Sequence, residues 1–279
     1  MTPDAIHVDD IILRALREDI NYVDISTQYL IAPEQESDAV LLAKADGVLS
    51  GLEVFLRVFE LTDKSFSAQT FFADGDTVAA GDVIARLHGK TAQLLKCERT
   101  ALNLIQHMSG IATQTAACVK ELEGTHAVIA DTRKTLPGLR VLQKYAVTCG
   151  KGKNHRFNLT DAAMLKDNHI DAYGGITAAV NALREKIGHT VKIEVEARDL
   201  AEVQQALDAG ADIIMLDNMS TDDMKQAVKL VCGRVPLEAS GNLAAGGLRR
   251  VALTGVDIIS SGALTHSVKA LDISLKIVK

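Results

Sequence analysis

The sequence has no tryptophan, and aromatic residues make up only 4% of its 279 positions. The hydrophobic core must therefore be built mainly from Ala, Val, Ile and Leu, since 47% of the residues are hydrophobic. Small aliphatic side chains suit the packing of helices on a parallel sheet better than the core of a β-sandwich. The chain is long enough for one barrel or for two unequal domains of an α/β protein.

Cysteine and long apolar runs are also scarce. The four cysteines, Cys97, Cys118, Cys149 and Cys232, are scattered and never form a Cys-x-x-Cys pair. Their simplest role is as small core residues in a reducing compartment. The N-terminal residues lack the charged and apolar regions of a signal peptide, and no apolar run approaches the length of a membrane span. We therefore expect a soluble, cytoplasmic protein without a membrane partner.

Positive charge is scarce overall but concentrated in one segment. The chain carries a formal net charge of −6, whereas residues 131–169 contain eight Lys and Arg side chains and only three acids. Because the basic residues are confined to this segment, no nucleic-acid partner is expected. Local positive charge in an acidic chain instead indicates a pocket for a small, strongly anionic substrate. The eight cations are Arg133, Lys134, Arg140, Lys144, Lys151, Lys153, Arg156 and Lys166.

The N-terminal part of the chain has the pattern of an α+β domain. Residues 6–17 have the apolar spacing of a helix, and residues 39–49, 66–72 and 78–85 have strand patterns next to turns that contain Gly. A long helical pattern follows over residues 91–122.

We expect that long helix to break at Ser109-Gly110, because glycine interrupts helices. The domain boundary is therefore placed at this point. We predict an N-terminal α/β domain of residues 1–110 and a barrel domain of residues 111–271. The C-terminal tail, residues 272–279, is expected to pack back on the first domain.

From residue 126 onward the pattern repeats as strand, polar loop and helix. The predicted strands are short and apolar on both faces, as in a buried parallel sheet. Six such steps without an obvious edge strand favour a closed or nearly closed parallel α/β barrel, whose active site is expected at the carboxyl ends of the strands. The predicted strands are residues 127–131, 163–166, 191–196, 212–217, 235–238 and 256–260.

Polar residues stand at the end of each predicted strand. The carboxylates of Glu196 and Asp217 suit Mg²⁺, which prefers oxygen ligands. Ser-Gly sequences after the last strands suit a phosphate held by backbone N–H groups. Paired Arg and Lys side chains suit a carboxylate or diphosphate. In chain order the strand ends hold Asp131-Thr132-Arg133-Lys134, Lys166-Asp167-Asn168, Glu196, Asp217-Asn218, Ser240-Gly241 and Ser261-Gly262-Ala263.

Each strand-end residue also has a simpler interpretation. A single acid after a strand is more often a helix cap or an ion-pair partner than a metal ligand. Lys166 could form a Schiff base, as in aldolases, and Ser-Gly is usually only a turn. The sequence also lacks Gly-x-x-x-x-Gly-Lys-Ser/Thr, Gly-x-Gly-x-x-Gly and Gly-x-Ser-x-Gly, and its histidines lack metal-ligand spacing. No organic cofactor is therefore expected.

A series of phrases resembles the quinolinate phosphoribosyltransferase family, in family order from residue 98 to residue 266. Several phrases in series are far more specific than any one alone. The phrases are Glu98-Arg99-Thr100-Ala101-Leu102-Asn103, Asp131-Thr132-Arg133-Lys134-Thr135, Pro137-Gly138-Leu139-Arg140, Asn154-His155-Arg156, Lys166-Asp167-Asn168-His169, Glu194-Val195-Glu196, Met215-Leu216-Asp217-Asn218, Glu238-Ala239-Ser240-Gly241 and Gly262-Ala263-Leu264-Thr265-His266.

The resemblance implies a type II phosphoribosyltransferase-like subunit, with an N-terminal α/β sandwich and an incomplete α/β barrel. It also implies a homodimer with shared active sites, in which Arg99 reaches the neighbour's site. The implied reaction joins quinolinate to 5-phosphoribosyl-1-diphosphate in the presence of Mg²⁺. Its products are nicotinate mononucleotide, diphosphate and CO₂, in NAD biosynthesis.

The resemblance also implies roles for individual residues. Glu196 and Asp217 would face the ribose hydroxyls and Mg²⁺, and would be catalytic together with Lys134 and Lys166. The dicarboxylate and diphosphate region would be lined by Arg99, Thr132, Arg133, Lys134, His155, Arg156 and Lys166. The 5-phosphate would be held by Ser240, Gly241, Asn242, Ser261, Gly262 and Ala263.

Three other functions stay open on the residues alone. One is a related phosphoribosyltransferase with another acceptor, although a less acidic acceptor would need fewer cations. Another is a Schiff-base aldolase that uses Lys166. The third is a non-catalytic ligand-binding protein on the same fold, against which the intact Asn-His-Arg and Lys-Asp-Asn-His phrases argue. The departures Lys151, Lys153, Asn158 and Asn242 put loop geometry in question more than the class of reaction.

Overall fold

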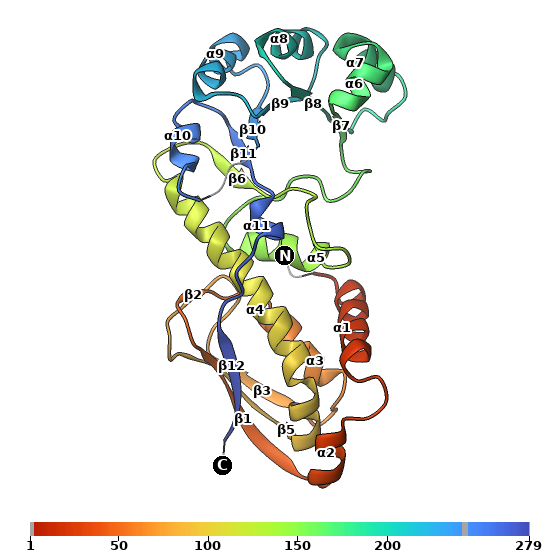
Figure 1. Cartoon of the computed structure of the whole chain (residues 1–279), viewed down its shortest axis with the longest axis vertical. Helices are drawn as coiled ribbons and strands as arrows, with labels where there is room; N and C mark the ends of the chain where they lie inside the picture. The colour runs from red at the N-terminus through yellow and green to blue at the C-terminus, as the bar shows by residue number, and fades with distance from the viewer. Residues whose placement is uncertain (1–2, 242–244, 279) are drawn as a thin grey trace. The chain divides into compact units, whose positions relative to one another are not determined.

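The computed structural model describes residues 3–241 and 245–278, which fold into two compact units (Figure 1). The first unit comprises Met1–Ala116, Thr135–Lys151 and Ser267–Lys279, and the second comprises Ala117–Lys134 and Gly152–His266. This division by contacts differs from the division by sequence at residues 111–116, 135–151 and 267–271, which belong to the first unit and not to the barrel.

The first unit contains a four-stranded antiparallel sheet in the order β12-β1-β5-β3. These strands are β1 (Glu36–Ala43), β3 (Ser67–Thr70), β5 (Val83–Lys90) and β12 (Ile273–Val278). Burial alternates along β1, where Ala39, Leu41 and Ala43 are buried, as expected for a sheet with one face on a core. The C-terminal strand pairs with β1, with Leu41 opposite Leu275. A small ribbon of β2 (Gly47–Val48) and β4 (Thr77–Val78) accompanies this sheet.

Three of the helices of the first unit begin at side chains that accept their first N–H groups. The helices are α1 (Ala5–Asp19), α2 (Ile25–Leu30), α3 (Leu52–Glu60), α5 (Arg140–Cys149) and most of α4 (Thr91–Glu121). Asp4 and Asp24 cap α1 and α2 by accepting backbone N–H groups, which satisfies donors that a helix start leaves unpaired. At the start of α3 the Asp74 carboxylate accepts the N–H groups of Gly51 and Leu52, both at 2.9 Å.

The predicted break at Ser109-Gly110 is wrong, because α4 continues without interruption from Thr91 to Glu121. A Cβ atom at position 110 would lie 2.3 Å from the carbonyl oxygen of Lys269. Gly110 therefore serves a close approach between two backbones inside the first unit, and does not end the helix.

The second unit is an incomplete parallel α/β barrel, as predicted. Its sheet has the order β6-β11-β10-β9-β8-β7, and β6 and β7 do not pair with each other in the part of the chain that the structure describes. The strands are β6 (Val128–Ala130), β7 (Ala163–Leu165), β8 (Ile193–Ala197), β9 (Ile213–Asp217), β10 (Leu237–Ser240) and β11 (Ile258–Ser260).

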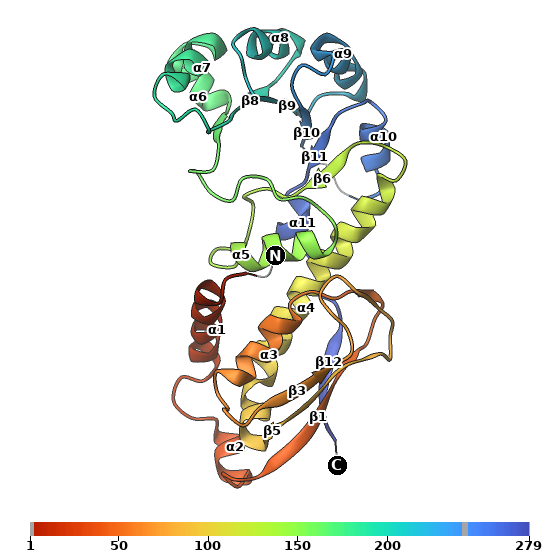
Figure 2. The ribbon, with the colours of Figure 1, turned by 180° about the vertical axis from the view of Figure 1, so that it is seen from behind.

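Helices follow the strands of this unit, and most of them cover the outer side of the sheet (Figure 2). They are α6 (Asp167–Tyr173), α7 (Ile176–Arg184), α8 (Leu200–Asp208), α9 (Thr221–Val231), α10 (Leu248–Ala252) and α11 (Ala263–His266). Caps again define the starts: Asp199 accepts the N–H of Glu202 at α8, and Ser220 accepts that of Asp223 at α9. None of the helices among the described residues has the length and apolar character needed to cross a bilayer.

The strand register determines which side chains face the interior of the barrel. Side chains alternate along a strand, so Glu194 and Glu196 share one face of β8 while Val195, between them, is fully buried on the other. Neighbouring strands pair Met215 with Glu238. Acidic side chains therefore enter a space that an ordinary barrel fills with apolar ones, and such a substitution marks a functional site.

Candidate active site

A cavity of about 500 Å³ lies at the carboxyl ends of the strands of the second unit. Ten of the residues predicted from the sequence line it: Thr132, Arg133, Lys134, His155, Arg156, Lys166, Glu196, Asp217, Ser240 and Gly241. Five further residues complete the lining: Met164, Met215, Asn218, Glu238 and Ser260. The cavity thus collects cations, carboxylates and hydroxyl groups from the ends of six strands and from the segment that holds His155 and Arg156.

The cations on one side of the cavity come from the loop after β6 and from the segment that follows α5. The Thr132 hydroxyl accepts the N–H of Lys134 at 3.0 Å, which shapes the first loop. The Arg156 guanidinium donates to the carbonyl oxygen of Ala162 at 3.0 Å. Burial lowers the pKa of Arg156, and the nearby Arg133 lowers it further. Two cations held together in a partly buried site favour an anionic ligand.

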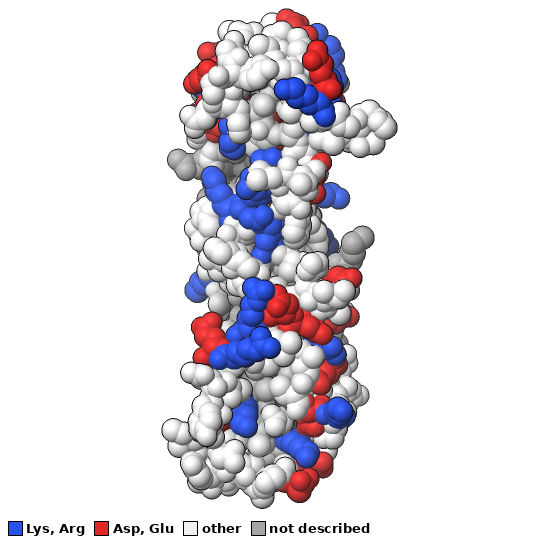
Figure 3. All heavy atoms as spheres, turned by 90° about the vertical axis from the view of Figure 1, so that its right-hand side faces the viewer, with Lys and Arg blue, Asp and Glu red and all other residues white. Residues whose placement is uncertain are grey.

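Only half of the cationic segment contributes to this cavity. Arg140, Lys144 and Lys151 belong to the first unit, and Lys153 does not line the cavity in the described structure. Lys144 is the clearest case, because it lies in α5 and only 1% of its surface is exposed. The cations that line the cavity are therefore the four that the strand-end and Asn-His-Arg phrases contain, namely Arg133, Lys134, Arg156 and Lys166. Figure 3 shows a group of Lys and Arg side chains on the face that is seen there.

Two carboxylates lie at the ends of neighbouring strands on the other side. Glu196 is at the end of β8, and its Oε2 atom lies 2.7 Å from Nζ of Lys166. Asp217 ends β9 and accepts a hydrogen bond from the Asn218 amide at 2.9 Å. A Cβ atom at Gly241 would lie 2.4 Å from Asn218 Oδ1, and the φ angle of Gly241 is +139°, so this position requires glycine.

The predicted phosphate-binding residues are only partly brought together. Ser240 and Gly241 line the cavity, whereas Ser261, Gly262 and Ala263 are not part of its lining in the described structure. Asn242 lies outside the described residues. The neighbouring Ser260, which the sequence interpretation passed over, lines the cavity instead. Its hydroxyl is buried and has no hydrogen-bond partner among the described residues.

Arg99 lies in α4 of the first unit. It lines a pocket of about 370 Å³ formed within that unit by residues of α2, of α4 and of the segment after α1. Its predicted role at a neighbour's active site stays a prediction.

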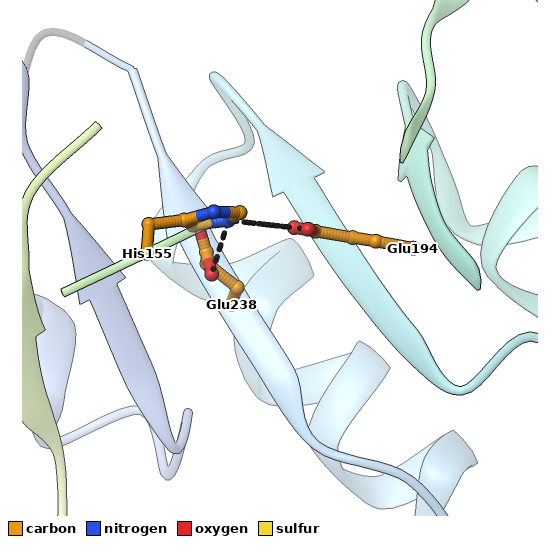
Figure 4. A group of neighbouring side chains, drawn as sticks. All are labelled: His155, Glu194 and Glu238. Carbon is orange, nitrogen blue, oxygen red and sulfur yellow. Dashed lines mark hydrogen bonds and ion pairs between the residues drawn. The ribbon is translucent and has the colours of Figure 1, made fainter. Parts of the chain in front are cut away.

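A group of three buried side chains at the cavity was also missed (Figure 4). Nε2 of His155 lies 3.1 Å from Glu194 Oε2 and 3.4 Å from Glu238 Oε2. Burial by itself lowers the pKa of His155, but the hydrogen bonds to the two glutamates outweigh it and raise the pKa to about 10. Burial raises the pKa of Glu194, and the bond from His155 opposes that rise. The alternation of acids with apolar residues in β8 was the available sequence signal.

An incomplete parallel barrel with cations and carboxylates in a cavity at its strand ends suits a transferase of the phosphoribosyltransferase class. The chain belongs to the quinolinate phosphoribosyltransferase family. The family model of the N-terminal domain of quinolinate phosphoribosyl transferase matches residues 24–109, and that of the C-terminal domain matches residues 111–276.

Relatives with curated names and solved structures agree with this assignment. The probable nicotinate-nucleotide pyrophosphorylase (carboxylating) of Bacillus subtilis is 45% identical over 260 residues, which are 93% of this chain and 90% of the relative. The structure of NadC from Streptococcus pyogenes is 44% identical, with a TM-score of 0.96 over the whole of both chains. The nicotinate-nucleotide pyrophosphorylase of Francisella tularensis has a TM-score of 0.93 and 40% identity, covering 98% and 96% of the two chains. The predicted family and fold class are confirmed.

Proposed function

We propose that this protein transfers phosphoribosyl from 5-phosphoribosyl-1-diphosphate to quinolinate, with decarboxylation to nicotinate mononucleotide. The observation that carries the proposal is the composition of the cavity, in a chain of the quinolinate phosphoribosyltransferase family. Four cations, Arg133, Lys134, Arg156 and Lys166, share it with Glu196 and Asp217. Both substrates are anionic, and the transition state adds positive charge at the ribose, so a cavity with both signs of charge suits the reaction.

The acceptor is assigned to the cationic side of the cavity. Quinolinate has carboxylates on adjacent ring atoms, and each can be bound by a guanidinium or an ammonium group. Burial is the main cause of the lowered pKa of Arg156, and repulsion by the nearby Arg133 lowers that pKa further. A dicarboxylate removes that repulsion, whereas a monocarboxylate such as nicotinate removes less of it. The arrangement therefore favours quinolinate as the acceptor.

The donor is assigned to the side formed by β8 to β11. Glu196 and Asp217 would stabilise the positive charge that develops at the ribose carbon as the diphosphate leaves. Ser240 and Gly241 would receive the 5-phosphate, and the unpaired hydroxyl of Ser260 offers one more donor. Decarboxylation then needs mainly placement, because the pyridine nitrogen becomes cationic on ribosylation and attracts the electron pair of the departing carboxylate.

Mg²⁺ fits the residues that are present. Glu196 and Asp217 supply hard oxygen ligands at the ends of paired strands, as this ion prefers. The ammonium group of Lys166 lies 2.7 Å from Glu196 Oε2. Mg²⁺ would therefore compete with Lys166 for this oxygen atom. When bound, Mg²⁺ would neutralise charge on the diphosphate.

The active site is further proposed to be shared in a homodimer, with Arg99 supplied by the partner subunit. Arg99 lies in the first unit and does not line the cavity of its own chain in the described structure. A second anionic substrate would gain from one more cation, which supports this assignment.

The Schiff-base alternative is disfavoured by the surroundings of Lys166. A Schiff-base lysine needs a neutral amine, which desolvation or a nearby cation supplies. The side chain of Lys166 is 47% exposed and its Nζ atom lies 2.7 Å from Glu196 Oε2, so it is neither desolvated nor free of an anionic partner.

The function is tested with the purified protein, quinolinate labelled in the 2-carboxylate, the ribosyl donor and Mg²⁺. Labelled CO₂ and nicotinate mononucleotide should form in equal amounts, and a chelator should stop their formation. Nicotinate is the matched control acceptor and should react far more slowly. Equal use of nicotinate, or ribosylation without release of CO₂, would contradict the proposal.

A further inference from the structure

Glu194 and Glu238 reach His155 from two strands that are not neighbours. Glu194 lies on β8 and Glu238 on β10, with β9 between them, and both point to Nε2 of His155 (Figure 4). Only 2% of either glutamate side chain is exposed, and only 12% of the histidine. The contact joins β8 and β10 to the segment that follows α5, and both His155 and Glu238 line the cavity.

The other edge of the imidazole ring also faces the protein. Nδ1 of His155 lies 2.7 Å from the backbone nitrogen of Arg156, whose N–H points toward it. Both the glutamates and this N–H favour a proton on Nε2. The N–H at Nδ1 opposes the second ring proton, whereas the two glutamates, which raise the pKa of His155, favour it. The segment is anchored once more by Asp131, which accepts the N–H of His155 at 2.9 Å and the amide of Asn154 at 2.6 Å. Neither ring nitrogen is thus turned toward a ligand in this geometry.

A purely structural role does not account for this group well. Replacing buried ion pairs by apolar residues of similar volume is often neutral or stabilising. Moreover, the Oε1 atom of Glu238 is buried and has no hydrogen-bond partner among the described residues. A buried carboxylate oxygen without a hydrogen-bond partner costs free energy, and Glu238 lines the cavity. Its presence there indicates a role in the function of the site.

We propose that Glu238 is a positioning residue for the acceptor: with Glu194 it holds His155, and through His155 it fixes the peptide that presents Arg156 to the cavity. This inference rests on the proposed function and deepens it. Glu194 also attracts the guanidinium of Arg156 electrostatically, so this glutamate opposes the effect of Arg133 on Arg156 before any ligand binds. The glutamates therefore keep the acceptor site ready in the free protein, which reduces the reorganisation that binding would otherwise require.

A metal ion is the competing occupant of the same group. The three ligand atoms lie within 4.8 Å of one another, which is close enough to hold one. The N–O distances of 3.1 and 3.4 Å are explained by hydrogen bonds from one shared Nε2 proton, without an ion. Adding Zn²⁺ or Mg²⁺ to the free protein separates the two possibilities.

The main test compares Glu238→Gln with wild type and with Glu185→Gln, an exposed site on the outside of the barrel that undergoes the same change of charge. Loss of one charged hydrogen-bond partner should raise KM for quinolinate about 10- to 100-fold. KM for the ribosyl donor should change less than about threefold, because Glu238 acts on binding through His155 and Arg156, which lie on the acceptor side. Glu185→Gln should match wild type. A folded Glu238→Gln protein with unchanged KM for quinolinate, or with equal rises for both substrates, would overturn the proposal.

A spectroscopic measurement on the wild type keeps the proposal testable if Glu238→Gln does not fold. Two-bond ¹H–¹⁵N spectra, with His155 assigned by its loss in His155→Gln, should show Nε2 protonated in the free protein at neutral pH. An unprotonated Nε2, or loss of the Nε2 proton on addition of Zn²⁺ or Mg²⁺, would overturn the positioning role. Failure of the proposed function is distinct: wild type would then neither bind quinolinate in calorimetry nor release CO₂, whatever the state of His155.

Discussion

Replacement of Lys166 separates the proposed reaction from its alternatives. Lys166 begins the loop after β7, and its ammonium group lies 2.7 Å from Glu196 Oε2 in the cavity. Lys166→Ala removes this cation and leaves the carboxylate of Glu196 without it. The same substitution therefore weakens the attraction for anionic substrates and adds repulsion from an uncompensated carboxylate.

The expected magnitudes differ strongly between stability and activity. The lysine side chain is 47% exposed, so the pair resembles a surface salt bridge, which contributes about 0–1 kcal/mol to stability. A hydrogen bond from a charged donor to an anionic substrate contributes about 1.5–3 kcal/mol. Its loss corresponds to about a 10- to 150-fold decrease in kcat/KM, because each 1.4 kcal/mol is about tenfold. Lys166→Ala should thus lose activity while it keeps almost all of its stability.

The assay measures kcat/KM for quinolinate at saturating donor, together with the urea midpoint of unfolding. Lys166→Arg is the informative companion, because it keeps the positive charge but cannot form a Schiff base. An anion-binding role predicts partial activity for Lys166→Arg, whereas a Schiff base predicts none. If Lys166→Ala kept kcat/KM within about threefold of wild type while folded, the assignment of Lys166 to substrate binding would be refuted.

Two further predictions follow from other parts of the structure. If the partner supplies Arg99, a mixed dimer of one Arg99→Ala and one Lys166→Ala subunit has one intact site. Mixing the two inactive proteins under subunit exchange should therefore restore about a quarter of all sites. No recovery of activity would contradict the shared site. Asp63 is only 7% exposed, and burial alone would raise its pKa. Hydrogen bonds from Ser65 and from the backbone N–H of Lys90 outweigh burial, so the pKa of Asp63 is lowered. A carboxyl group with a lowered folded pKa contributes stability that is fully present above its unfolded pKa of about 4 and is lost as pH falls through the folded value. The stability gap between wild type and Asp63→Asn, from urea unfolding, should therefore shrink between about pH 6 and about pH 3, and a gap independent of pH would refute the assignment.

Much of the second unit could be predicted from local sequence. Periodicity, turn residues and caps act over a few positions, so the strand–loop–helix repeat and the polar strand ends were visible without a structure. The same local rules failed at Gly110, where the reason for a glycine is the carbonyl of Lys269, far away in the chain. A local pattern cannot distinguish a glycine that ends a helix from one that lets another segment approach.

The composition of the cavity depends on both the sequence and the tertiary structure. The sequence by itself determined that Arg133, Lys166, Glu196 and Asp217 follow parallel strands, and strand ends of a barrel meet on one side. Only the tertiary structure decided that Lys144 is buried in another unit, that Ser260 lines the cavity, and that Glu194 and Glu238 meet at one histidine. The physical reason is that these contacts depend on strand register and side-chain direction between segments that are distant in the chain, and no neighbouring residue encodes them.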